Sequence, residues 1–154
     1  MTTQLRDEIR QTKPFASLEH EAHLSIERTA AVLSHSLAEA LKARGVTPVQ
    51  YNALRILRGA GDAGLCRGEV RDRLVAQVPD VTRLLDRLEA AGLVARERGT
   101  DDRRYVTTRI TPSGLRLLDE LDQPVEELHR GLLGHLDEGE LRTLIALLAK
   151  VRAG

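Results

Sequence analysis

In residues 65–111, two helical patterns are followed by two strand patterns. This order restricts the possible folds of the chain more than any other feature of the sequence. Apolar residues recur at helical spacing in residues 67–75 and again after Pro79. We expect Pro79 at the first position of the second helix, because the fixed φ of proline and its missing N–H suit that position. Gly92 is expected to end this helix. The buried face of the second helix is predicted to contain Val81, Leu84, Leu85 and Leu88.

Two short runs rich in β-forming residues follow the second helix, at residues 93–98 and 105–110. The polar and charged residues 99–104 join them, so the pattern predicts a β-hairpin. Two helices joined by a turn and followed by such a hairpin form a winged helix-turn-helix. In this fold one helix enters the major groove of DNA, and the hairpin, or wing, reaches the neighbouring backbone or minor groove.

Long amphipathic helices are predicted on both sides of this segment. One runs from Ser17 to Gly45, and a further helix begins at Pro48 with Thr47 as its N-cap. After the hairpin, Thr111 and Pro112 repeat this start. The following helix carries a heptad-like apolar seam, namely Leu118, Leu121, Val125, Leu128 and Leu132. A capping box at residues 137–140 is expected to begin the last helix.

These flanking helices offer more apolar surface than one small winged helix can cover, which predicts a homodimer built from both chain ends. The expected fold class is mainly α (α+β). Residues 1–46 would form an N-terminal arm and dimerisation helix, residues 47–111 the winged helix-turn-helix DNA-binding domain, and residues 112–154 the C-terminal dimerisation helices. A two-fold dimer would read a near-palindromic operator.

The charge balance restricts how such a protein could bind DNA. The chain has 23 basic and 23 acidic residues, and residues 67–109 hold 10 basic and 8 acidic side chains. This weak bias argues against nonspecific coating of DNA and favours a few well-placed arginines. A single cysteine and the lack of a long apolar run or signal peptide suggest a cytoplasmic protein. No motif for nucleophilic, phosphate-binding or acid–base catalysis is present, so we expect neither an enzyme nor a cofactor.

Four sequence blocks at characteristic spacing resemble the MarR family of bacterial transcriptional regulators. They are residues 46–51 (VTPVQY), 81–96 (VTRLLDRLEAAGLVAR), 101–104 (DDRR) and 108–114 (TRITPSG). The similarity extends from about residue 20 to the C-terminus. It implies a triangular homodimer that commonly represses nearby genes. It also implies release of DNA when a small, often phenolic, ligand or an oxidant arrives, with the ligand pocket between the dimer helices and the winged helix.

The resemblance also suggests roles for individual residues. Thr82 and Arg83 match positions that contact the operator from the second helix of the motif, called the recognition helix. Arg87 matches a position that acts as a buttress as often as a contact. An ordinary solvated helix face, with these arginines paired to Asp80 and Asp86, is the simpler alternative.

The tip of the wing carries a second set of candidates. Arg104 matches the family's wing arginine, which enters the minor groove, and Asp102 matches the acid that steadies it. Arg103 lies next to them and is a further candidate contact. Alternatively, both arginines merely keep an exposed loop soluble.

Asp80 departs from the family pattern, because Pro79 and Asp80 replace small hydroxyl residues at the start of the recognition helix. A carboxylate facing DNA repels phosphate, but near a helix N-terminus it is favoured by the helix dipole and can accept from cytosine N4. We therefore expect either cytosine readout or an intramolecular pair with Arg83.

Three further interpretations remain open from the sequence. Cys66 could be a redox switch, although a small apolar filler is the commoner role of a free cysteine. His20, His23 and Glu27 share a helical spacing, but solvated side chains are favoured over a metal site. The protein could also be a dimerisation module that does not bind DNA.

Overall fold

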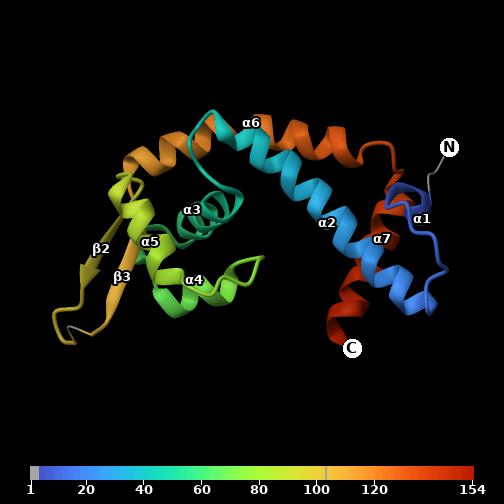
Figure 1. Cartoon of the computed structure of the whole chain (residues 1–154). Coiled ribbons are helices and arrows are strands. Elements are labelled where there is room, and N and C mark those ends of the chain that lie inside the picture. Colours follow the sequence, from blue (N-terminus) through green and yellow to red (C-terminus); the bar gives the residue numbers. More distant parts are fainter. Residues whose placement is uncertain (1–3, 103) are drawn as a thin grey trace.

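The computed structural model describes residues 4–102 and 104–154, and Figure 1 shows the arrangement of its elements. The prediction of a mainly helical chain with a winged helix-turn-helix is confirmed. The helices are α1 (Leu5–Glu8), α2 (Leu18–Lys42), α3 (Pro48–Ala60), the short 3₁₀ helix η1 (Gly61–Ala63), α4 (Arg67–Arg73), α5 (Val81–Ala90), α6 (Pro112–Leu133) and α7 (Glu138–Ala153). The strands are β1 (Leu65–Cys66), β2 (Val94–Arg98) and β3 (Val106–Ile110).

Side chains cap the helices where the sequence predicted it. The Thr47 hydroxyl accepts the backbone N–H of Gln50 at 3.2 Å, and the Gln50 side chain accepts the N–H of Thr47 at 3.0 Å. Asp137 and Glu140 form the same reciprocal pair at the start of α7. Such contacts satisfy backbone donors that a helix start otherwise leaves unpaired.

The start of α5 differs from the prediction. Pro79 is not the first helical residue, because Asp80 is the N-cap and the helix begins at Val81. The Asp80 carboxylate accepts the backbone N–H of Arg83 at 2.9 Å, and this cap outweighs the tendency of proline to start a helix. The preceding helix is also shorter than expected, since α4 ends at Arg73 and Leu74 is already extended.

The end of α5 leads directly into the wing. Gly92 has a φ of 74°, and its N–H donates to the Glu89 carbonyl at 2.9 Å. The N–H of Leu93 donates to the Leu88 carbonyl at 3.0 Å. These two bonds form a Schellman motif, which ends a helix with a glycine in the left-handed region. The predicted helix stop at Gly92 is therefore confirmed.

The wing belongs to a three-stranded antiparallel sheet with the order β1-β3-β2. The predicted hairpin is present, because β2 pairs with β3 from Val94 opposite Ile110 to Arg98 opposite Val106. The sequence did not reveal β1, which adds only Leu65 and Cys66 to the other edge of β3. Two residues are too few to show an alternating pattern.

The core lies inside the winged helix, among its helices and strands, and is almost entirely aliphatic. It contains the predicted apolar face of α5, namely Val81, Leu84, Leu85 and Leu88. On α3, Tyr51, Leu54 and Leu57 are buried, whereas Ile56 is only half-buried. The first half of α6 joins this core through Leu118, Leu121 and Val125.

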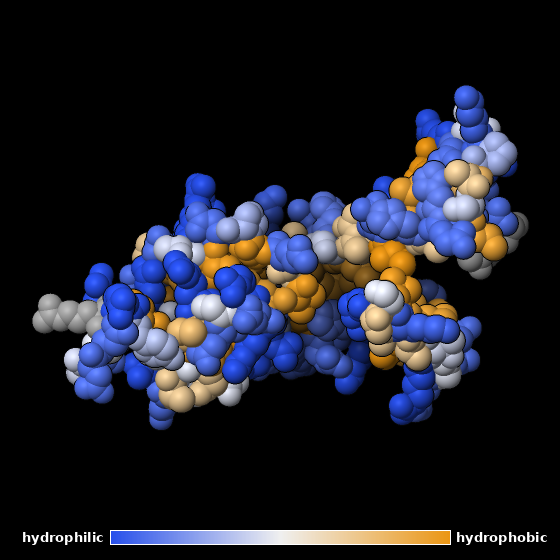
Figure 2. Space-filling view, turned by 90° about the horizontal axis from the view of Figure 1, so that it is seen from below, coloured by the Kyte–Doolittle hydropathy of each residue, from blue (hydrophilic) through white to orange (hydrophobic). Residues whose placement is uncertain are grey.

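The other end of the molecule has much apolar surface. The helices α2 and α6 extend away from the winged helix, and α7 and both chain ends lie at their far end (Figure 1). No residue of α7 is buried, and Ile145 and Val151 are 65% and 63% exposed. Figure 2 shows hydrophobic side chains on both lobes at this end. Within the described residues, no helix is both long and apolar enough to cross a membrane.

Candidate nucleic-acid interface

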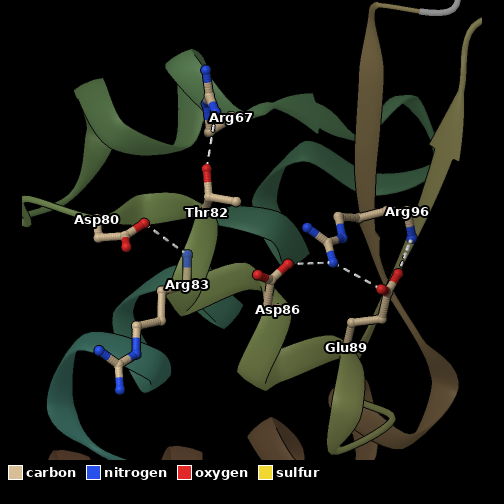
Figure 3. Close-up of polar contacts among 7 residues, drawn as sticks. All are labelled: Arg67, Asp80, Thr82, Arg83, Asp86, Glu89 and Arg96. Atoms are coloured by element: carbon tan, nitrogen blue, oxygen red, sulfur yellow. Dashed lines mark hydrogen bonds and ion pairs between the residues drawn. The ribbon is translucent and has the colours of Figure 1, made fainter.

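The polar face of α5 has two edges that differ in their partners. Successive helical residues are rotated by about 100°, so Thr82, Asp86 and Glu89 lie along one edge and Arg83 and Arg87 along the other. Residues of α4 and β2 contact the first edge, which we call the wing-side edge (Figure 3). We call the second the outer edge.

Arg96 of β2 ties the wing to the wing-side edge. Its Nη2 atom lies 2.6 Å from Asp86 Oδ1 and 2.8 Å from Glu89 Oε1, and its backbone N–H donates to Glu89 Oε2 at 3.2 Å. The hydrogen bond from the Arg96 side chain lowers the pKa of the Glu89 carboxyl. The Glu89 carboxylate therefore stays charged at neutral pH. These contacts fix the recognition helix relative to the wing.

Sequence reasoning did not select Arg96, although it lies within the motif at residues 81–96. A signal was available in the two acidic residues, Asp86 and Glu89, because they face one side of the helix that precedes the strand. That signal shows only that a cation is needed, and the fold determines which arginine supplies it.

The outer edge is open to the surface. The side chains of Arg83 and Arg87 are exposed, and neither takes part in a side-chain hydrogen bond or ion pair within residues 4–102 and 104–154. The pairing of these arginines with Asp80 and Asp86, expected for an ordinary solvated helix face, is therefore absent from the described part of the chain. Two guanidinium groups without carboxylate partners suit contact with an external anion or base edge.

Asp80 contacts Arg83, but through the backbone of Arg83. Its Oδ1 atom accepts the Arg83 backbone N–H, and the guanidinium group of Arg83 points away (Figure 3). The expected intramolecular pair therefore takes the form of a helix cap rather than an ion pair. This use of the carboxylate also agrees with the favourable field at a helix N-terminus.

The wing tip holds Arg104 in an open position. Its side chain is 92% exposed, and Asp102 Oδ1 accepts its backbone N–H at 2.9 Å and its Nε–H at 3.3 Å. Asp102 thus orients the arginine without covering it. Arg103 lies outside the described residues.

Residues of α4, α5 and the wing line a cavity of about 360 Å³. Its lining includes Cys66, Thr82, Arg96, Arg104 and Tyr105. Cys66 is half-buried at the N-cap of α4, where its N–H donates to Glu69 Oε2 at 2.8 Å. This position gives Cys66 a local structural role in addition to the two interpretations from the sequence.

The histidine cluster on α2 does not converge. His23 Nε2 lies 3.5 Å from Glu27 Oε2, but His20 Nδ1 accepts the backbone N–H of Ala16 instead. Among the described residues, no group of three or more His, Cys, Asp or Glu side chains could hold a metal ion.

Comparisons with known proteins agree with this geometry. Residues 44–104 match the sequence model of the MarR family. The multiple antibiotic resistance protein MarR of Escherichia coli is 33% identical over 116 residues, which cover 75% of this chain and 79% of that protein.

Two solved structures extend the comparison to nearly the whole chain. A MarR transcription factor from Planctomyces limnophilus is 40% identical, with a TM-score of 0.69 and coverage of 88% of this chain and 98% of that one. A variant of Escherichia coli MarR complexed with operator DNA is 28% identical, with a TM-score of 0.77 and coverage of 97% and 99%. The chain therefore belongs to the MarR family of transcriptional regulators.

Proposed function

We propose that this protein is a homodimeric repressor that binds a near-palindromic operator in double-stranded DNA and responds to a small ligand. The observation that carries the proposal is the open outer edge of α5, where Arg83 and Arg87 are exposed without partners in the described chain. A structural relative with similarity over most of the chain is complexed with operator DNA. The protein would act in the cytoplasm, where bacterial DNA lies.

In this proposal the recognition helix reads the major groove. Arg83 contacts a base edge or phosphate, Thr82 contacts the operator beside it, and Arg87 contributes a contact or a buttress. Asp80 lies at the N-terminus of α5, where its Oδ1 atom caps the helix. Its other carboxylate oxygen would accept a hydrogen bond from cytosine N4.

The wing would contact the adjacent minor groove. Arg104 enters the groove, Asp102 orients Arg104, and Arg103 is a further candidate contact. The exposed position of Arg104 and its two hydrogen bonds with Asp102 support this assignment.

The dimer would form from residues 1–46 and 112–154, and residues 47–111 would bind DNA. The exposed apolar residues of α7 support this division, because a monomer in water would leave them uncovered. A two-fold dimer would present two recognition helices about one turn of DNA apart, roughly 34–36 Å.

An apolar cavity of about 470 Å³ between α2 and α6 supports the proposal of a small phenolic or aromatic effector. Its lining includes Leu33, Leu37, Leu128, His129 and Leu132. The volume falls in the common range for small-molecule sites, and one polar ring among leucines could orient a hydroxyl group. The effector would weaken operator binding by favouring a conformation that binds DNA poorly. The size of this effect is limited by the difference between the effector's affinities for the two conformations.

Sequencing the DNA that the purified protein retains from fragmented genomic DNA tests the function directly. Fluorescence anisotropy then gives the affinity for the selected operator. We expect Arg83→Ala to weaken binding by about 1–3 kcal/mol, whereas Lys42→Ala, which also removes one exposed positive charge, leaves it nearly unchanged. Retention of no specific sequence would instead favour a dimerisation module that does not bind DNA.

A further inference from the structure

The side chain of Arg67 crosses from α4 to the recognition helix. Arg67 is the first residue of α4, and its Nη1 atom donates to Thr82 Oγ1 at 2.9 Å (Figure 3). Its side chain is exposed and forms no ion pair with a carboxylate of the described residues. A positive charge therefore lies beside the hydroxyl group that the proposed function directs at DNA.

This contact restricts what the Thr82 hydroxyl can bind. A threonine hydroxyl has one donor and two acceptor lone pairs, so by itself it accepts either kind of partner. A guanidinium group has only donors, so Arg67 occupies one lone pair of Oγ1 and directs the O–H away from itself. The adjacent positive charge also disfavours a second incoming donor and strengthens the O–H as a donor.

The contact is not needed to hold the two helices together. Buried Val70 of α4 and buried Val81 and Leu85 of α5 already belong to one apolar core. A hydrogen bond between two surface side chains adds little to such packing. Its main consequence is therefore the orientation of the hydroxyl group.

We propose that Arg67 is a positioning residue that makes Thr82 a hydrogen-bond donor toward an acceptor atom of the operator. This inference rests on the proposed function. In the major groove the acceptors are purine N7, guanine O6 and thymine O4, and phosphate oxygens are acceptors on the backbone. The amino groups of cytosine and adenine are donors, so this site discriminates against them.

A double-mutant cycle tests the coupling between the two residues. Thr82→Val removes the hydroxyl with little change in shape, and Arg67→Gln removes the charge. We expect each single variant to lose about tenfold in affinity for the selected operator. In the Thr82→Val background, Arg67→Gln should change the affinity less than about twofold, because the group that it positions is gone.

Conservative and matched variants separate positioning from other roles. Arg67→Lys should recover most of the affinity, because lysine also offers only donors. Arg71→Gln removes an exposed arginine of the same helix, one that pairs with Asp72 at 3.1 Å, and should leave the affinity unchanged. Unfolding temperatures of all variants should agree with that of the wild type.

Binding-site selection identifies the acceptor. If it is a base edge, Arg67→Gln and Thr82→Val should both relax the same operator position, and positions read by Arg83 should stay unchanged. If it is a phosphate, both variants should weaken all sequences equally, and their effects should still not add.

Fully additive effects of the two substitutions would overturn the inference. So would a weaker salt dependence of binding when Arg67→Gln is added to Thr82→Val, with the slope of log affinity against log salt smaller in magnitude by about 0.9. Either result would make Arg67 an independent phosphate contact. If the wild type selects no sequence at all, the proposed function itself fails, and the inference fails with it. The two failures are therefore distinguishable.

Discussion

Asp80 is a residue at which two functions compete for one carboxylate. Its Oδ1 atom caps α5, yet its place at the start of the recognition helix would also allow contact with cytosine. Substitutions that preserve the cap and remove the charge separate these functions.

We expect Asp80→Ala to lower the free energy of unfolding by about 0.5–2 kcal/mol, because the Arg83 N–H loses its side-chain acceptor. Asp80→Ser should restore most of this stability, since serine is also a good N-cap. Urea unfolding followed by circular dichroism measures both. If Asp80→Ser is stable and selects the same operator as the wild type, Asp80 does not read cytosine.

A second residue-scale prediction concerns the ion pair between Arg58 of α3 and Asp122 of α6. Two hydrogen bonds of 2.8 and 2.9 Å join them, and the bond from Arg58 lowers the pKa of the Asp122 carboxyl. The folded state therefore binds a proton less readily than the unfolded state at this site. The stability that the pair contributes is present above the usual pKa of an aspartate and is lost as the pH falls through the lowered value.

We expect Asp122→Asn to lower stability at pH 7 by less than about 1 kcal/mol, because the pair is partly exposed to water. The difference from the wild type should shrink toward zero in acid. Asp119→Asn is a suitable control, because Asp119 is 75% exposed and lies 3.9 Å from Arg58, farther away than Asp122 at 2.8 Å. A difference that grows in acid would contradict this assignment.

At the scale of elements, we expect Arg96 to set the angle between α5 and the wing. It bridges two carboxylates of α5 from the neighbouring strand, and its side chain is only 23% exposed. We expect Arg96→Met to leave Asp86 and Glu89 without their cation and to loosen the hairpin against the helix. Hydrogen exchange in β2 and β3 should become faster, and operator affinity should fall.

A compensating variant tests whether lost orientation or unpaired charge causes these effects. Adding Asp86→Asn and Glu89→Gln to Arg96→Met should restore stability but not operator affinity. If affinity also returns, the bridge has no role in placing the wing.

At the scale of the whole molecule, we expect a second protomer to cover the exposed helix α7. Because none of its residues is buried in the protomer, substitutions there should disturb assembly without disturbing the core. We expect Ile145→Glu to shift the protein from dimer to monomer and to weaken operator binding strongly, since half-sites would then bind separately. Sedimentation equilibrium measures the assembly, and Arg142→Gln on the same helix is the control. A wild type that sediments as a monomer would rule out the dimeric repressor.

Local interactions made several features readable from the sequence. The apolar spacing of α5, the caps at Thr47 and Asp137, and the helix stop at Gly92 each depend on residues within about one or two helical turns. Such contacts involve only residues that are close together in the sequence, so short patterns were sufficient to predict the winged helix.

Only the tertiary structure determined which side chains of the candidate site contact other residues of the chain and which are exposed without a partner among the described residues. The contacts of Arg67 with Thr82 and of Arg96 with Asp86 join separate elements, and β1 exists only because β3 lies beside it. Each outcome depends on distances between elements, and those distances are set by the packing of the whole core.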